Sequence, residues 1–238
     1  MRFSKRIYAL RDAVQINETV ADIGTDHGYV PMLVVREGIS PHAIMSDISS
    51  ESLSKAIETF KAVNISVNPS DFRVGDGLDT IEYGEVDDII IAGLGGHTIA
   101  NILDADIEKT RSFKKLILQP RKHSGALRLW LYANGFSIEK EILTSEGKFI
   151  CEIIVAVPTD DTPAILPYPE NDIRWAYPES LRYADHDNLN KRVTWKLNSI
   201  EEQIENLTNS NKDYEANICD LREEYKYLIQ LLSNDEKA

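Results

Sequence analysis

The segment Ala21-Asp22-Ile23-Gly24-Thr25-Asp26-His27-Gly28-Tyr29 decides the fold. It begins as a short apolar strand, reaches an acid at Asp22, and turns between two glycines toward a helix expected over residues 31–36. Glycine lets the backbone approach a ligand closely, and the N-terminus of the following helix offers free N–H groups. Ligands of open α/β sheets bind at the carboxyl ends of the strands. This turn is therefore the first candidate for a binding site.

The alternation of strand and helix continues along the chain. Apolar runs predict strands over residues 19–24, 43–47, 72–74, 88–92 and 115–119, followed by an antiparallel pair over 136–143 and 149–157. Helical periodicity predicts helices over residues 3–14, 31–36, 49–63, 97–103 and 125–134. Strands that alternate with helices form a mostly parallel sheet with helices on both faces. We therefore expect an α/β domain over residues 1–158.

The C-terminal third follows a different pattern. Five prolines between residues 158 and 178 indicate a linker or a wrapped extended segment over 159–180. Beyond it, apolar residues recur at alternating steps of three and four, which is typical of a coiled-coil seam. The seam consists of Leu197, Ile200, Ile204, Leu207, Tyr214, Ile218, Leu221, Tyr225, Leu228 and Leu232. Residues 208–211 form helix poorly, so we expect a hairpin of two antiparallel helices over 181–238, with one continuous helix as the alternative.

Composition narrows the class of protein. The 238 residues are 42% hydrophobic and 27% charged, as in ordinary globular domains. The two cysteines, Cys151 and Cys219, lack zinc-type spacing, which argues against a disulfide scaffold or metal site and favours a reducing, cytoplasmic compartment. The N-terminus leads into an amphipathic stretch, and the longest apolar run, near residues 89–92, is much too short to cross a bilayer. We expect neither a secretion signal nor a membrane partner.

Charge is distributed unevenly. The net charge of −13 argues against a polyanionic partner, but residues 109–128 hold seven basic side chains and no acid. Local basic patches, rather than the total charge, decide whether a nucleic acid binds. The candidate phosphate contacts are Lys5, Arg6, Lys114, Lys115, Arg121, Lys122, Arg128 and Lys191. The alternative is a solvated face.

The ends of the other predicted strands carry side chains that suit a nucleoside. Asp47 stands 19 residues after Gly28 and is placed to accept hydrogen bonds from a ribose diol. Asp76, at the end of the third strand, is placed to reach an adenine amino group. The candidate cofactor-binding residues are Asp22, Gly24, Thr25, Asp26, His27, Gly28, Asp47, Ile48, Asp76, Gly77, Gly93, Leu94 and Gly95.

Three ligands fit such a site: a nicotinamide dinucleotide, a flavin and S-adenosylmethionine. The dinucleotide fingerprint G-x-G-x-x-G is absent, and Asp26 within the turn would repel a pyrophosphate. The same acid is compatible with the ammonium and sulfonium charges of S-adenosylmethionine, which is therefore the favoured cofactor. A tight β–α turn without any ligand is the alternative.

Several short motifs occur in a fixed order. They are Ser4-Lys5-Arg6, residues 21–31, Ser46-Asp47-Ile48, Gly75-Asp76-Gly77-Leu78, residues 91–96 and residues 116–120. Together they resemble the bacterial tRNA (adenine-22-N1)-methyltransferase family over residues 1–157. The resemblance implies a Rossmann-like class I methyltransferase domain with a C-terminal helical coiled-coil hairpin and S-adenosylmethionine as the donor. It also implies a tRNA partner, with N1 of a D-arm adenine as the acceptor. Arg121 departs from the asparagine that is common at its position.

The residue chemistry agrees with direct attack by a ring nitrogen. Pyrimidine C5 methylation uses an activated cysteine, and both cysteines are expected to be packing residues. Methylation of the exocyclic adenine amine commonly uses an Asn/Asp-Pro-Pro-aromatic stretch, but residues 93–96 read Gly-Leu-Gly-Gly. A ring nitrogen needs neither device, because its lone pair attacks the methyl group and the enzyme supplies position and field.

Three residues of the first turn are candidates for catalysis. We predict that Asp26 stabilises the positive charge developing on the base and that His27 and Tyr29 line the base pocket. A helix N-cap is the alternative role for Asp26, and ordinary packing is the alternative for the other two.

Other functions compete with this interpretation. They are a small-molecule methyltransferase, a non-catalytic S-adenosylmethionine-binding module and a nucleotide-dependent oxidoreductase, the last disfavoured by the missing fingerprint. The coiled coil is expected either to grip tRNA or to form a weak homo-oligomer, and its net acidity keeps the second role open.

Overall fold

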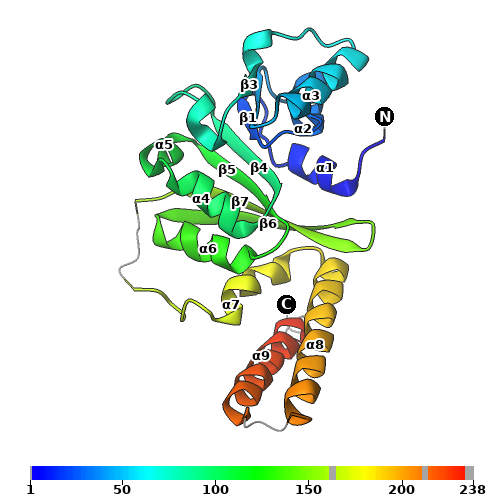
Figure 1. Cartoon of the computed structure of the whole chain (residues 1–238), viewed down its shortest axis with the longest axis vertical. Helices are drawn as coiled ribbons and strands as arrows, with labels where there is room; N and C mark the ends of the chain where they lie inside the picture. The colour runs from blue at the N-terminus through cyan, green and yellow to red at the C-terminus, as the bar shows by residue number, and fades with distance from the viewer. Residues whose placement is uncertain (1, 161–164, 211–213, 234–238) are drawn as a thin grey trace.

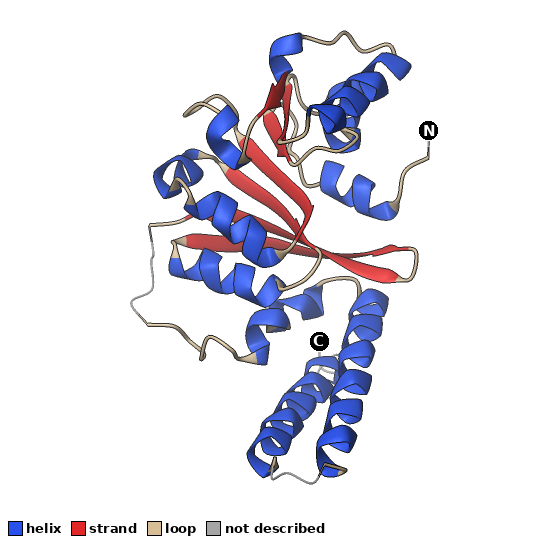
Figure 2. Cartoon of the chain, in the orientation of Figure 1, coloured by secondary structure: helices blue, strands red, loops and turns tan. Residues whose placement is uncertain are grey.

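The computed structural model describes residues 2–160, 165–210 and 214–233, and a seven-stranded sheet forms its centre (Figures 1 and 2). The strand order is β3-β2-β1-β4-β5-β7-β6. All neighbours are parallel except β7, which runs antiparallel to both β5 and β6. The strands are β1 (Val20–Ile23), β2 (Ala43–Asp47), β3 (Phe72–Val74), β4 (Asp88–Leu94), β5 (Lys115–Pro120), β6 (Phe136–Glu146) and β7 (Phe149–Pro158). This arrangement confirms the predicted Rossmann-like α/β class.

Helices cover both faces of the sheet. One face packs against α1 (Lys5–Arg11), α2 (Tyr29–Arg36) and α3 (Ser50–Ala62), and the other against η2 (Gly77–Thr80), α4 (Gly96–Asp104) and α6 (Ser124–Ala133). Successive strand residues alternate between the faces: Ile90 joins the first core, whereas Ile89 and Ile91 join the second. Burial on both faces explains why the parallel strands are apolar throughout. Within this domain the sequence did not predict the turn η1 (Pro69–Asp71), the turn η2, or the helix α5 (Ile107–Ser112) in the basic stretch.

The strands β6 and β7 form a hairpin and are longer than the other strands of the sheet. They have 11 and 10 residues, and Figure 2 shows the hairpin extending beyond β5, with α1 above it and α8 below it. Both helices contact β6. The hairpin therefore brings the N-terminal helix and the C-terminal helices close to one edge of the molecule.

The proline-rich segment is more structured than a linker. It forms α7 (Ile173–Ala176) and the turn η3 (Glu179–Tyr183), which bury Trp175 and Leu181. Leu181 packs with Leu143 of β6. The segment thus wraps the sheet through short helices, and residues 161–164 of the predicted linker lie outside the described part of the chain.

The C-terminal region forms two antiparallel helices, α8 (His186–Thr208) and α9 (Glu215–Ser233). The expected hairpin is therefore confirmed, and the alternative of one continuous helix is wrong. Leu197, Ile200, Leu228 and Leu231 fill its seam, and the same cluster includes Leu143 of β6. The apolar seam predicted from the sequence thus continues into the edge of the sheet.

A buried ion cluster joins α8 to the sheet. The carboxylate of Glu152 in β7 pairs with Arg128 of α6 and, at 2.7 Å, with Nη1 of Arg192 in α8. Arg192 also donates to the carbonyl of Ala176 at 3.0 Å. The division into residues 1–158, 159–180 and 181–238 stays a prediction, and these contacts cross both of its boundaries. None of the helices in the described ranges combines the length and apolar content needed to span a bilayer.

Candidate active site

The turn between β1 and α2 has the tight, glycine-dependent geometry expected of a ligand cradle. Gly24 and Gly28 have φ values of 77° and 62°, which favour glycine. A Cβ atom on Gly28 would come within 3.0 Å of the Cβ atom of Ala56 in α3. Gly28 is also the N-cap of α2, with no side-chain cap. The alternative role of Asp26 as the helix N-cap is therefore wrong, because the N-cap position lies two residues later, at Gly28.

A cavity of about 270 Å³ opens at this turn. It lies at the carboxyl ends of β1 and β4, and most of its lining was predicted from the sequence. The predicted lining residues are Asp22, Gly24, Thr25, Asp26, His27, Gly28, Tyr29, Gly93 and Leu94. Arg6, Ile7, Leu10, Val30, Ala92 and Arg121 complete the wall. The structure thus brings the two glycine-rich segments together with α1 and the end of β5.

The other predicted cofactor residues lie at the same sheet edge but outside the lining of this cavity. The Asp47 carboxylate, at the end of β2, accepts a hydrogen bond from the Ser49 amide at 2.7 Å. Ile48 beside it is 74% exposed. Asp76 and Gly77 follow β3, and Gly95 follows β4. These residues would extend the site along the carboxyl edge toward β3, and their binding roles stay predictions.

Asp22 is the electrostatic centre of the cavity. Burial raises the pKa of its carboxyl group to about 6, against a hydrogen bond from the Thr25 hydroxyl and the positive charge of Arg6, which both favour ionisation. Asp47 opposes ionisation through its like charge. A carboxylate withdrawn from water in this way gains most from a cationic partner. The site therefore suits a ligand that carries positive charge next to β1.

Aromatic rings gather at the mouth of the cavity. The His27 and Tyr29 rings stack with centroids 5.0 Å apart and an interplanar angle of 5°. Phe3, which precedes α1, contacts Tyr29, and the centroids of the two rings are 5.2 Å apart. Asp26 is exposed and lies 3.2 Å from Nζ of Lys55 and 3.4 Å from Nε2 of His27. The three candidate catalytic residues therefore form one group at the entrance.

The predicted basic stretch is not one surface. Lys115 is 4% exposed and pairs with Glu18 and Asp88, and Arg128 is 3% exposed within the Glu152 cluster. Neither side chain is available to a phosphate, so both predictions were wrong. The reason is that each residue lies on the buried side of its element, which a count of charges along the sequence does not reveal.

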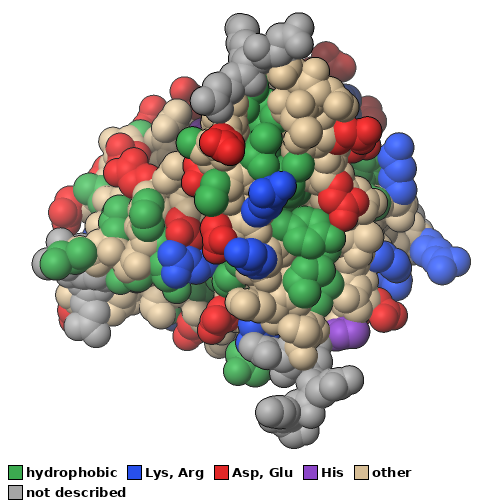
Figure 3. All heavy atoms as spheres, turned by 90° about the horizontal axis from the view of Figure 1, so that it is seen from below, with side chains coloured by type: hydrophobic (Ala, Val, Ile, Leu, Met, Phe, Trp, Pro, Cys, Tyr) green, Lys and Arg blue, Asp and Glu red, His purple; other side chains and the backbone are tan. Residues whose placement is uncertain are grey.

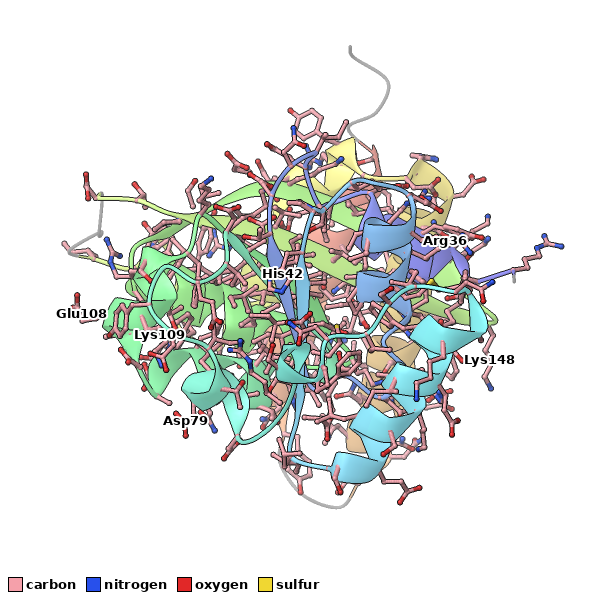
Figure 4. All side chains as sticks on the ribbon, turned by 90° about the horizontal axis from the view of Figure 1, so that it is seen from above. Arg36, His42, Asp79, Glu108, Lys109 and Lys148 are labelled. Carbon is pink, nitrogen blue, oxygen red and sulfur yellow. The ribbon has the colours of Figure 1, made fainter. Side chains whose placement is uncertain are left out.

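The remaining basic candidates are divided between the two ends of the sheet. Lys114 is exposed and pairs with Asp87 at 2.7 Å, but it precedes β5 and lies at the edge away from the cavity. Lys109 also lies away from the β6–β7 hairpin, at the opposite side from Lys148 (Figure 4). Lys5, Arg121, Lys122 and Lys191 are exposed, and Arg6 is half-buried. Seen from below, basic and acidic side chains are interspersed rather than gathered (Figure 3).

Sequence reasoning missed residues that position Arg6. Its Nε atom lies 3.0 Å from Oε2 of Glu146 at the end of β6, and Nη1 lies 3.4 Å from Oε1 of Gln119. Ser4 donates to Glu146 at 2.7 Å. Gln119 could have been found, because it ends a strand at the ligand-binding edge. Glu146 gave no such signal, since its role depends on a contact 140 residues away in the sequence.

The comparisons with known proteins agree with this geometry. Residues 3–154 match the family model of a methyltransferase domain. The chain is 34% identical to the tRNA (adenine(22)-N(1))-methyltransferase of Bacillus subtilis over 156 residues, which are 66% of this chain and 65% of that protein. It is 31% identical over 186 residues to a putative tRNA methyltransferase of Mycoplasma pneumoniae, covering 74% of this chain and 83% of that protein.

The chain belongs to the bacterial tRNA (adenine-22-N1)-methyltransferase family. Among solved structures, the Bacillus subtilis m1A22 tRNA methyltransferase TrmK superposes with a TM-score of 0.77 at 28% identity, covering 97% of this chain and 99% of that one. In sequence, the aligned region spans just under two thirds of the Bacillus subtilis methyltransferase. The structural match covers more of both chains than the sequence match does.

Proposed function

We propose that this chain transfers a methyl group from S-adenosylmethionine to N1 of adenine 22 in the D-arm of tRNA, producing 1-methyladenosine. One observation supports the donor most directly. The cavity at the carboxyl ends of β1 and β4 holds a desolvated acid, Asp22, between two glycine turns. An ammonium or sulfonium group is the partner that such an acid favours.

The residues around the cavity fit the rest of the donor. One carboxylate oxygen of Asp47 accepts a hydrogen bond from the Ser49 amide, and among the described residues the other oxygen is left to accept from a ribose hydroxyl. Ile48, with its exposed side chain, offers an apolar surface for an adenine ring, and Asp76 offers an acceptor for its amino group. We place the methionine end of the donor beside Asp22 and the adenosine end beside β2 and β3.

The chemistry requires no covalent enzyme intermediate. The bound donor supplies an electrophilic methyl group, the N1 lone pair forms the new N–C bond, and the S–C bond breaks. Burial and the Glu146 charge raise the pKa of the Cys151 thiol, so it is a poor nucleophile at neutral pH. The protein's contribution is then to position the base and to supply a negative field.

The group at the cavity mouth is placed to act on the acceptor base. The base becomes cationic on methylation, and the Asp26 carboxylate lies at the entrance to offset that charge. Lys55 pairs with Asp26, which holds the carboxylate but also weakens its field. We assign the stacked His27 and Tyr29 rings to the wall against which the adenine packs.

The proposed acceptor atom determines how the tRNA must bind. N1 lies on the pairing edge of adenine, so the base must leave its stack before it reaches the donor, at a cost of a few kcal/mol. Exposed Lys5, Arg121, Lys122 and Lys191 are the phosphate contacts that remain. We also propose a cytoplasmic location, where tRNA is modified, and leave the hairpin as a second tRNA contact or a weak oligomer contact.

One experiment tests this function directly. The purified chain is incubated with labelled S-adenosylmethionine and unmodified tRNA transcripts, and the nucleoside products are identified by mass spectrometry. We expect 1-methyladenosine in transcripts that carry adenine 22 and none in transcripts that carry guanine there. Donor binding without methylation of any transcript would favour a small-molecule substrate or a non-catalytic module.

A further inference from the structure

A second cavity adjoins the donor cavity and has no role in the chemistry above. It has a volume of about 540 Å³ and shares Arg6 and Arg121 with the donor cavity. The end of β5, the tip of the β6–β7 hairpin and α8 form its walls, with Gln119, Phe149 and Trp195 among the lining residues. We call this cavity the Trp195 groove. It meets the donor cavity at Arg6 and Arg121 and reaches α8 of the C-terminal hairpin at Trp195.

Two large aromatic side chains are exposed in the groove. Phe149 is 60% exposed and Trp195 is 49% exposed. Trp195 lies on α8 between Val193 and Leu197, which face the helical seam, so its ring points away from that seam. Within residues 2–160, 165–210 and 214–233, neither ring packs against another aromatic ring. Exposed aromatic rings of this kind are stacking platforms for unpaired bases.

Positive charge surrounds these rings. The ammonium group of Lys148 lies 5.4 Å from the Phe149 ring centroid, and Figure 4 shows Lys148 at the edge of the molecule. Lys191 is exposed one helical turn before Trp195, on the same side of α8. Arg121 forms no ion pair within 4.0 Å in the part of the chain that the structure describes, although its charge helps to lower the pKa of Glu146, the acid that also lines the groove. Aromatic platforms with a basic rim are typical of surfaces that bind single-stranded nucleic acid.

We infer that the Trp195 groove seats the unpaired nucleotide next to the target adenine, with its base stacked on Trp195 or Phe149. The inference rests on the proposed function, since it takes tRNA as the substrate. Extruding the adenine breaks its stacking with its neighbours, and a groove that shares Arg6 and Arg121 with the donor cavity would replace that stacking with protein rings. Arg121, at the junction of the two cavities, is placed to contact the phosphate that joins the two nucleotides.

The groove is tested by tRNA affinity, measured with S-adenosylhomocysteine present so that no methylation is needed. We expect Trp195→Ala to raise the tRNA Kd by about 5- to 100-fold, the usual effect of losing one stacked base. Trp195→Phe should retain most of the affinity, because it keeps an aromatic face. Tyr183→Ala is the matched control, since Tyr183 is 93% exposed and lies outside the groove.

Substrate variants separate stacking from loss of structure. A transcript with an abasic site beside adenine 22, made in turn on the 5′ and the 3′ side, should bind the wild-type chain weakly on one of the two sides. The same abasic transcript should lose no further affinity with Trp195→Ala, because the stacked base is already absent. Full additivity of the two changes on both sides would overturn the inference.

Two further measurements keep the outcomes distinct. Donor affinity should be unchanged in Trp195→Ala, and a parallel loss of donor and tRNA binding would show damage to the fold. If sedimentation shows a dimer that Trp195→Ala converts to a monomer, the groove is a contact between two copies, and the inference is wrong. If the wild-type chain binds no tRNA at all, the proposed function fails before the groove is in question.

Discussion

At the scale of single residues, Asp22 links the fold to donor binding. Its carboxyl pKa of about 6 lies above the ordinary value of 3.8 because the group is desolvated. In the free protein it is ionised at neutral pH and becomes protonated as the pH falls through about 6. The protonated form has no charge to offer an ammonium group. Because desolvation outweighs the favourable charge of Arg6, the ionised Asp22 also destabilises the fold at neutral pH, and protonation relieves this cost.

We therefore expect the Kd for S-adenosylmethionine to rise by about tenfold between about pH 7.5 and pH 5, as the Asp22 carboxylate takes up a proton. Isothermal titration calorimetry across this range measures the effect. Asp22→Asn should bind the donor weakly and with little pH dependence. A Kd that stays constant for the wild-type chain would separate Asp22 from the cationic end of the donor.

Asp47 tests the ribose end of the same site. Asp47→Ala removes the proposed acceptor for the ribose hydroxyls, and we expect donor binding to weaken by about 1–3 kcal/mol. Asp71→Ala is a matched control, because Asp71 lies near the same strands but pairs with His42 instead of facing the site. Equal donor affinity in the wild-type chain and Asp47→Ala would remove Asp47 from the ribose role.

At the scale of elements, β5 separates the basic stretch into two groups of residues with different surroundings. Its amino end carries Lys114 and Lys115, which pair with acids, and its carboxyl end leads into Arg121 and Lys122 beside the donor cavity. A six-residue strand spans roughly 20 Å, so basic residues that are close in the sequence lie at opposite edges of the sheet. Only the carboxyl end lies beside the donor cavity.

Neutralising one lysine at each end of β5 tests which end binds the tRNA. Lys122→Gln should raise the tRNA Kd and reduce the slope of log Kd against log salt by about one, as expected for one lost phosphate contact. Lys114→Gln, the matched control at the other end of β5, should leave both quantities unchanged. Filter binding at several salt concentrations measures both variants. The reverse ranking would place the tRNA on the amino edge of the sheet.

At the scale of the whole molecule, the Glu152 cluster holds the helical hairpin against the sheet. Although burial by itself opposes ionisation, Arg128 and Arg192 lower the pKa of Glu152 to about 2. The stabilisation from this lowered pKa is present above about pH 4.5, the ordinary value for glutamate, and is lost as the pH falls toward 2. The cluster therefore stabilises the hairpin contact throughout the neutral range.

Arg192→Ala should lower the free energy of unfolding by about 3 kcal/mol at neutral pH, because it leaves a buried carboxylate with one partner fewer. Urea denaturation measures the loss, and the difference from the wild-type chain should shrink as the solution is acidified below about pH 4. Lys226→Ala, which removes an exposed ion pair of α9, should change stability little. Equal stability of Arg192→Ala and the wild-type chain would mean that the hairpin is held by its apolar contacts alone.

The sequence by itself determined the strands, the main helices of the sheet domain and the edge at which the donor cavity lies. Strand and helix periodicity are local properties, and the carboxyl ends of parallel strands meet at one edge. Asp22, Gly24, Gly28 and Gly93 could therefore be assigned to a common site from their places in the pattern, and the cavity brings them together. The local pattern of the C-terminal region favoured two helices over one continuous helix, and the structure decided between them.

Only the tertiary structure decided which charges are accessible and what adjoins the donor cavity. Lys115 and Arg128 are buried because acids distant in the sequence face them, and such pairing leaves no periodic trace. The contact between Arg6 and Glu146 likewise depends on how far the β6–β7 hairpin extends past β5. The Trp195 groove exists because that hairpin and α8 meet beside the cavity, and the packing of separate elements is a global property of the chain.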